Sequence, residues 1–124
     1  MLHRNRLFGF CLAAIASTAR DGAGTVGENA VNSQFFLIFD HDAKFIDIIK
    51  NPFFDGRNDA DQMIVNLLAA SQIAVIAAEK FSEALKDRLT DKNIQYVEIS
   101  GPIEEAVKIV FNKKGGDKTL TNHG

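Results

Sequence analysis

Short apolar runs separated by loop-forming residues predict several strands in the first half of the chain. Residues 12–17 are small or apolar, and residues 35–39 form an uninterrupted apolar run of strand length, as in strands that are buried on both faces of a sheet. Residues 40–43 have the composition of a turn, and a strand pattern resumes over residues 44–50. These two strand patterns predict an antiparallel hairpin, which Asn51-Pro52 ends.

Apolar residues at helical spacing predict three helices in the second half, over residues 60–71, from Phe81 to Leu89 and from Pro102 to Lys114. Strand patterns at 73–78 and 96–99 precede the second and third of these helices. The third helix has the clearest ends, with a proline at its first position, two glutamates in its first turn, two lysines in its last turn and a glycine after it. The order βββαβαβα requires parallel strands joined by right-handed crossovers, so we expect an α/β fold with a mixed five-stranded sheet covered by helices.

The composition indicates one globular domain. The chain has 124 residues, of which 46% are hydrophobic and 24% charged, and this length is sufficient to bury a core without crosslinks. The formal net charge is -2 and no segment gathers lysine and arginine, which argues against nucleic-acid binding. No apolar stretch approaches the roughly 20 residues of a membrane-spanning helix. The one cysteine, Cys11, cannot form an internal disulfide, as expected in a reducing cytoplasm.

We divide the chain into an N-terminal extension (residues 1–10), a single domain (11–114) and a flexible tail (115–124). The N-terminus imitates a secretory signal, because basic residues precede the apolar stretch 7–16 and small residues follow it. We favour a first core strand, since a glycine-rich loop and a strand pattern follow directly. A cytoplasmic protein is therefore expected, with a cleaved signal as the alternative.

Two strand segments carry a family resemblance. Ala13-Ala-Ile-Ala-Ser17 and Phe35-Phe-Leu-Ile-Phe-Asp40, with the loop between them, are similar to the start of the dinitrogenase iron-molybdenum cofactor biosynthesis domain. That family includes NifX and the C-terminal part of NifB, and the resemblance continues in register over residues 11–112. It implies a ribonuclease-H-like three-layer α/β fold with this order of elements.

The loops depart from the family pattern. Asn29, Ala30 and Val31 stand where family members commonly carry His-Phe-Gly, and Gly56–Ala60 keeps one glycine of a Gly-Gly-x-Gly run. Ala77–Lys80 replaces a glycine-rich turn after the fourth strand. A metal–sulfur cluster is best held by thiolate or imidazole ligands and by close backbone approach at glycines. The resemblance thus implies a conserved scaffold with most of the usual cluster-binding residues replaced.

Residues 22–27 (Gly-Ala-Gly-Thr-Val-Gly) match the dinucleotide-binding pattern G-x-G-x-x-G. That mechanism requires a helix after the last glycine that is long enough to cross back over the sheet. Only seven residues separate Gly27 from the strand that starts at Phe35, which leaves no room for it. We interpret the segment as a flexible loop.

Acidic residues near the early strands offer an enzymatic alternative. Asp40, His41 and Asp42 are consecutive in a turn, where their side chains diverge, and we interpret them as solvated turn residues. Nucleases on a ribonuclease-H-like scaffold use convergent carboxylates and a divalent metal, and Asp21, Asp40 and Asp47 are the acids available here. A divalent-metal-dependent nuclease is therefore the alternative to a non-enzymatic protein, and we predict no catalytic residue or metal ligand.

The candidate site is defined by position, because ligands of open α/β sheets bind beyond the carboxyl ends of the parallel strands. The predicted elements bring nine candidate ligand-binding residues to that edge: Ser17, Thr18, Asp21, Asn29, Asn32, Arg57, Glu79, Ser100 and Gly101. Amides at Gly101, where a helix starts, could receive an anion, although capping explains that residue equally well.

The leading hypothesis is a non-enzymatic protein that binds a small anionic ligand, a metallocluster or a partner protein through the loop 18–34. An iron-sulfur or molybdenum-containing cluster follows from the resemblance alone. A protein-interaction module without a ligand is a further alternative. Phe53, Phe54 and the apolar hairpin could form a dimer surface or cover the core, so the sequence leaves the oligomeric state open.

Overall fold

The computed structural model describes residues 12–21, 23–52 and 59–116. These residues form five strands and three helices in the order that the apolar pattern predicts. The elements are β1 (Leu12–Ser17), β2 (Phe35–Phe39), β3 (Phe45–Lys50), α2 (Ala60–Ala70), β4 (Ile73–Ala78), α3 (Glu83–Asp91), β5 (Gln95–Glu98) and α4 (Ile103–Gly116).

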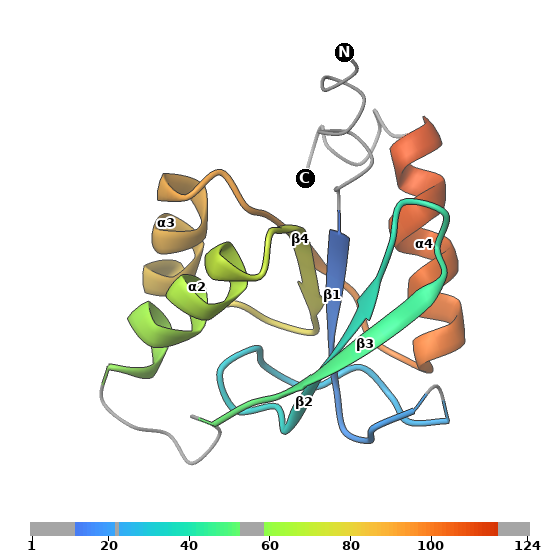
Figure 1. Ribbon diagram of the computed structural model, residues 1–124, viewed down its shortest axis with the longest axis horizontal. Coiled ribbons are helices and arrows are strands. Elements are labelled where there is room, and N and C mark those ends of the chain that lie inside the picture. The colour runs from blue at the N-terminus through green and yellow to red at the C-terminus, as the bar shows by residue number, and fades with distance from the viewer. Residues whose placement is uncertain (1–11, 22, 53–58, 117–124) are drawn as a thin grey trace.

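The five strands form one mixed sheet in the order β3-β2-β1-β4-β5. β2 pairs in antiparallel fashion with β1 on one side and with β3 on the other. β4 pairs in parallel with both β1 and β5. Helices α2 and α3 cover one face of the sheet and α4 covers the other (Figure 1). The predicted three-layer α/β fold with a mixed five-stranded sheet is therefore confirmed.

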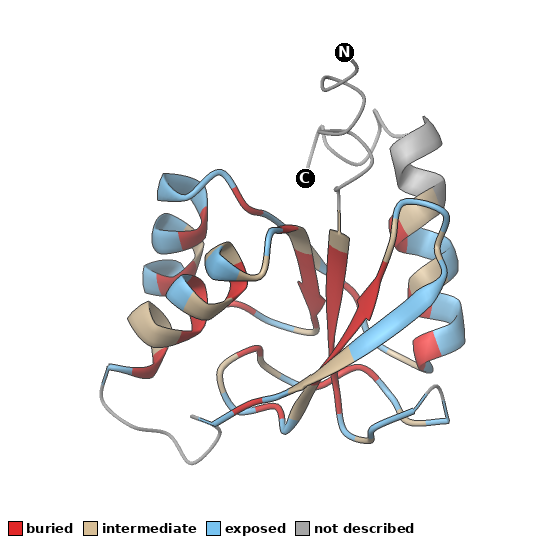
Figure 2. Cartoon of the chain, viewed as in Figure 1, coloured by how far each residue is buried: buried red, intermediate tan, exposed pale blue. Residues whose placement is uncertain are grey.

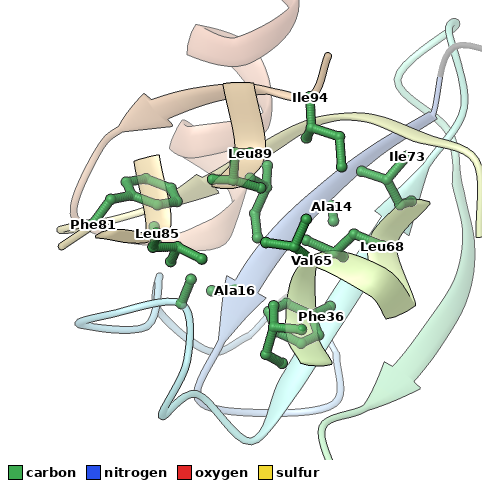
Figure 3. Close-up of a cluster of buried hydrophobic side chains, with 14 of the residues drawn as sticks. Ala14, Ala16, Phe36, Val65, Leu68, Ile73, Phe81, Leu85, Leu89 and Ile94 are labelled. Carbon is green, nitrogen blue, oxygen red and sulfur yellow. The ribbon is translucent and has the colours of Figure 1, made fainter. Parts of the chain in front are cut away.

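The core lies on both faces of the central strands, as their uninterrupted apolar sequences predict. Figure 2 shows β1 and β2 buried along almost their whole length, while the outer faces of the helices are exposed. Side chains alternate between the faces, because successive Cβ atoms of a strand point to opposite sides. Ala14, Ala16 and Phe36 pack against α2 and α3 (Figure 3), and Ile38 belongs to the same cluster. Ala13, Ile15, Leu37 and Phe39 belong to the cluster with α4.

Two helix ends differ from the predicted boundaries. The second helix begins at Glu83 instead of Phe81, because the Ser82 hydroxyl accepts a hydrogen bond from the Leu85 amide at 3.1 Å and caps the first turn. Phe81 lies before the helix, buried, with its ring centroid 5.4 Å from that of Tyr96. The third helix continues to Gly116, two residues beyond the predicted end, which is the usual scatter of helix boundaries.

A hairpin turn joins β2 and β3, as predicted. The Asp40 carboxylate accepts hydrogen bonds from the amides of Asp42 at 2.8 Å and Lys44 at 3.0 Å. Ala43 adopts a positive φ of 64°, which a tight turn requires there. In this turn Asp40 organises the backbone, in agreement with its interpretation as a turn residue.

β3 is an edge strand of the sheet and exposes part of its apolar sequence. Phe45 and Ile46 are each 47% exposed, and the Phe45 ring lies 5.7 Å from that of Phe39, centroid to centroid. The other aromatic residues considered for a dimer surface, Phe53 and Phe54, lie outside the described residues. Among the described helices, none is long and apolar enough to cross a membrane.

Candidate ligand-binding site

The loop 18–34 crosses the end of the sheet where β1 and β4, which are parallel, both finish (Figure 1). It first folds back on β1, because the Gly27 amide donates to the Ala16 carbonyl at 2.8 Å and the Thr18 amide donates to the Thr25 carbonyl at 3.1 Å. Ser17 and Val26 form an antiparallel bridge between these bonds. The loop therefore lies over the carboxyl end of β1.

The same loop is also bonded to β4 and α4. The amides of Glu79 and Lys80, at the end of β4, donate to the carbonyls of Gly27 at 3.0 Å and Glu28 at 2.9 Å. The Ile103 amide, at the start of α4, donates to the Gly24 carbonyl at 3.2 Å. These bonds fix the loop at several points, which is more order than the flexible loop that its composition indicates.

A polar hollow of about 310 Å³ opens between β1 and the loop. It is lined by residues at the end of β1 and by two stretches of the loop: Ser17, Thr18, Gly27, Glu28, Asn29, Asn32, Ser33 and Gln34. Apart from Gly27, each lining residue has a hydroxyl, carboxamide or carboxylate group. The hollow can therefore offer hydrogen bonds to a ligand.

One wall of the hollow is built from β1 and the part of the loop that lies on it. The Ser17 side chain is buried, and its hydroxyl donates to the Ala19 carbonyl at 2.6 Å. The Thr18 hydroxyl accepts a hydrogen bond from the Thr25 amide at 3.1 Å. Gly27 approaches the opposite wall so closely that a Cβ atom on it would lie 1.9 Å from the Ser33 Oγ. Only glycine allows this approach.

The opposite wall is the segment Asn29–Gln34, which begins with a side-chain-capped turn. The Asn29 carboxamide oxygen accepts a hydrogen bond from the Asn32 amide at 2.8 Å, and the Ser33 hydroxyl donates to the Asn29 carbonyl at 2.6 Å. Asn29 thus serves the turn through its oxygen. Its carboxamide nitrogen has no hydrogen-bond partner among the described residues and can donate to a ligand.

Four of the nine predicted site residues, Ser17, Thr18, Asn29 and Asn32, line the hollow. Asp21, Glu79, Ser100 and Gly101 lie near this edge of the sheet but do not line it, and Arg57 lies outside the described residues. The Asp21 carboxylate accepts from the Ala23 amide at 3.0 Å within the loop. Their proposed roles as ligand-binding residues remain predictions.

The start of α4 is in contact with the loop. The Val26 amide donates to the Gly101 carbonyl at 2.9 Å, and Thr25 forms a bridge with Pro102. The Ile103 amide, a donor that an anion would otherwise approach, already donates to the Gly24 carbonyl. The hollow is therefore the better-formed candidate site.

Sequence reasoning missed the other half of the lining, namely Gly27, Glu28, Ser33 and Gln34. Gly27 is the last glycine of the G-x-G-x-x-G match, so the pattern did mark a close backbone approach. In the structure this glycine is followed by the turn at Asn29 and then by β2, without a helix.

The donor set decides which metal chemistry the hollow can hold. Its described residues offer hydroxyl and carboxamide groups and one carboxylate, that of Glu28, without thiolate or imidazole. No group of three or more His, Cys, Asp or Glu side chains is placed to hold a metal ion in the described part of the chain. The set does not fit direct ligation of a metal–sulfur cluster by the protein, but it fits hydrogen bonding to the sulfur or oxygen atoms of one.

The arrangement of elements is shared with solved structures of low sequence identity. The apo form of the orange protein from Desulfovibrio gigas superposes with a TM-score of 0.76 at 14% identity, over 83% of this chain and 88% of that one. A candidate NifB protein from Thermotoga gives 0.71 at 17% identity, over 86% and 90%. A candidate dinitrogenase from Methanocaldococcus jannaschii gives 0.55 at 14% identity, over 83% and 89%. At these identities the likeness shows the fold.

The sequence itself identifies the family. No curated protein sequence matches the chain. The family model described as dinitrogenase iron-molybdenum cofactor matches residues 11–113, which is most of the chain and nearly the span over which the resemblance was recognised. The chain therefore belongs to the dinitrogenase iron-molybdenum cofactor family.

Proposed function

We propose that this protein is a non-enzymatic carrier or accessory domain that holds a small metal–sulfur cluster as cargo in the hollow between β1 and the loop 18–34. Membership of the cofactor family supports a role in cofactor biosynthesis or carriage. The observation that carries the proposal is the hollow at the carboxyl end of β1, which is the end of the sheet where ligands of open α/β sheets bind.

The cargo would be held by hydrogen bonds. The Asn29 carboxamide nitrogen and the Asn32 side chain can each donate to a sulfide or oxo group, whereas the Thr18 hydroxyl already donates to the Thr25 carbonyl at 3.4 Å. No protein atom needs to replace a ligand of the cluster, so the cargo can enter and leave without breaking a metal bond. Such exchange suits a protein that passes a cluster on.

A nuclease would need a different arrangement of acids. Two-metal or one-metal phosphodiester cleavage requires several carboxylates around one position. Asp40 is bonded into the hairpin turn and Asp47 accepts from the Ile48 amide in β3, while Glu28 is the one carboxylate among the described residues that line the hollow. These positions favour the carrier over the nuclease.

An anaerobic titration tests the proposal directly. The probe is tetrathiomolybdate, a small anion whose sulfurs accept hydrogen bonds, and the readouts are its visible absorption and the molybdenum retained after desalting. We expect the wild-type protein to shift the absorption and retain molybdenum. The variant Asn32→Ala should bind about threefold to tenfold more weakly, as expected for one lost hydrogen bond.

Asn66→Ala is the matched control, because Asn66 is exposed on α2 and its carboxamide bonds to Gln62 outside the hollow. Its affinity should equal that of the wild type. Native mass spectrometry of freshly purified protein adds an independent test for copurified cargo. A wild-type protein that neither retains molybdenum nor carries any cluster on purification would refute the proposal, and equal loss in both variants would place the binding elsewhere.

A further inference from the structure

Asn51, which follows β3, is a buried polar residue outside the hollow. It is 1% exposed, and its carboxamide nitrogen donates to two backbone carbonyls, Val31 at 2.8 Å and Ser33 at 2.7 Å. Its backbone amide donates to a third carbonyl, that of Gln34, at 2.9 Å. One residue at the end of the hairpin thus makes three hydrogen bonds to the segment that forms one wall of the hollow.

These bonds account for both protons of the side-chain nitrogen. A carboxamide at this point supplies two donors in one plane, which leucine or alanine cannot supply and which an aspartate would replace with an acceptor. The bond to the Ser33 carbonyl is buried and that to the Val31 carbonyl is partly buried, and buried backbone carbonyls are almost always bonded. The residue type is therefore matched to its two acceptors.

The contacts continue from Asn51 into the hollow. Ser33, whose carbonyl Asn51 holds, donates through its hydroxyl to the Asn29 carbonyl and faces the Gly27 backbone. Asn29 in turn caps the turn with Asn32. A shift of Ser33 would therefore move both the gap to Gly27 and the turn that carries two of the proposed donors.

We infer that Asn51 is a positioning residue of the hollow: it holds the wall Asn29–Gln34 in place and links the geometry of the site to the β2–β3 hairpin. Asn51 touches no ligand in this arrangement. The effect on cargo binding rests on the proposed function, whereas the effect on the wall does not.

Amide hydrogen exchange separates the two parts of the inference. In Asn51→Ala, the amides of the wall, above all the Asn32 amide that is bonded to Asn29, should exchange about tenfold faster than in the wild type, because the two side-chain bonds that hold the wall are lost. The control is Leu89→Ala, which opens the core beneath α3 and lowers the stability of the whole domain. Denaturant is added until the two variants have the same global stability. Exchange in the segment Asn29–Gln34 should then still be faster in Asn51→Ala than in Leu89→Ala, and the rest of the domain should exchange equally in both.

Tetrathiomolybdate titration of the same variants gives the second readout. We expect about tenfold weaker binding by Asn51→Ala and unchanged binding by Leu89→Ala at matched stability. If the wild type neither binds the probe nor carries a cluster on purification while the wall of Asn51→Ala exchanges faster, the carrier function is wrong and the positioning role stands. Wall exchange equal in the two variants would overturn the positioning role.

The wild-type protein provides a test that needs no variant to fold. The two side-chain amide protons of Asn51 should exchange with solvent at least tenfold more slowly than those of the exposed Asn66 in nuclear magnetic resonance spectra. If the Asn51 protons exchange as fast as those of Asn66, the bonds to Val31 and Ser33 do not persist and the positioning role of Asn51 is wrong.

Discussion

Gly27 and Ser33 lie on opposite walls of the hollow, so close together that there is no room for a Cβ atom on Gly27. Such an atom would lie 1.9 Å from the Ser33 Oγ and 2.9 Å from the Ser33 Cβ. The first contact could be relieved by a rotation of the hydroxyl, but the second requires the backbone of one wall to move. The two walls are therefore held as close as a glycine permits.

Gly27→Ala should lower the free energy of unfolding by about 1–3 kcal/mol, the usual cost of overpacking a close contact. Denaturant unfolding followed by circular dichroism measures the change. Gly27→Ala should cost less when it is made in Ser33→Gly than in the wild type, because Ser33→Gly removes the two atoms that lie within 3 Å of the new methyl group and leaves the Ala16 Cβ at 3.4 Å. A loss that is the same with and without the Ser33 side chain would contradict this explanation.

Gly101, just before α4, is required for a different reason. A Cβ atom added there would have nothing within 4 Å, but the residue has a φ of +105°, which L side chains rarely adopt. Gly101→Ala should therefore destabilise the protein by about 1 kcal/mol through backbone strain alone. Denaturant unfolding measures this loss of stability. A second substitution that shortens a neighbouring side chain should not restore the lost stability. Rescue by such a change would show a steric cause.

The order of strands and helices could be predicted because each element has its own local signal. The run at Phe35–Phe39 can bury both faces only in the middle of a sheet, and β2 does lie between two strands. The start of α3 was misplaced because Phe81 continues the helical spacing of Leu85 and Leu89. The cap at Ser82 decides where that helix starts, and Phe81 packs from outside it.

The candidate site could be predicted only where it depends on the ends of strands. Ser17 and Thr18 follow from the end of β1, and Asn29 from the register of β2. Asn51 could not be found in this way, because its acceptors are at Val31 and Ser33, far away in the chain, and Asn-Pro is an ordinary ending for a strand. Glu79 and Ser100 lie at the predicted end of the sheet but do not line the hollow. The loop 18–34 is bonded there to the backbone of Glu79 and of Gly101, which follows Ser100.

Glu28 is the one carboxylate among the described side chains that line the hollow, so its charge should weaken the binding of an anion. Glu28→Gln should tighten the binding of tetrathiomolybdate roughly fivefold at low salt, which corresponds to about 1 kcal/mol of relieved repulsion. The gain should shrink as salt is added. Titrations at low and moderate ionic strength measure both effects.

Asp91→Asn is the control for the change in net charge. Asp91 is the last residue of α3 and lies before the start of β5, so it is near the amino ends of the parallel strands, whereas the hollow is at their carboxyl ends. It should leave the affinity almost unchanged, because its charge is far from the ligand and screened. Equal tightening in both variants would mean that net charge matters and the position of Glu28 does not.

Asp40 should make the stability of the β2–β3 hairpin depend on pH. The backbone hydrogen bond from Lys44, with a further bond from Asp42, lowers the pKa of the Asp40 carboxyl below its ordinary value of 3.8. These bonds favour the charged form in the folded state, so the stabilisation is fully present above the unfolded pKa and is lost as the pH falls through the lower, folded pKa. The wild type should therefore be more stable than Asp40→Asn at neutral pH, and the difference should shrink in acid.

Two measurements check this expectation together. A carbon-detected titration of Asp40 should give a folded pKa below 3.8. Denaturant unfolding of both proteins between about pH 7 and about pH 2 should show that their difference in unfolding free energy falls as Asp40 is protonated. Both bonds are made to Oδ1 of Asp40, and the carboxamide oxygen of an asparagine there can accept them too, so the variant retains the turn and isolates the contribution of the charge. A difference in stability that stays constant down to the lowest pH would show that the turn depends on the shape of the side chain and that its charge adds nothing.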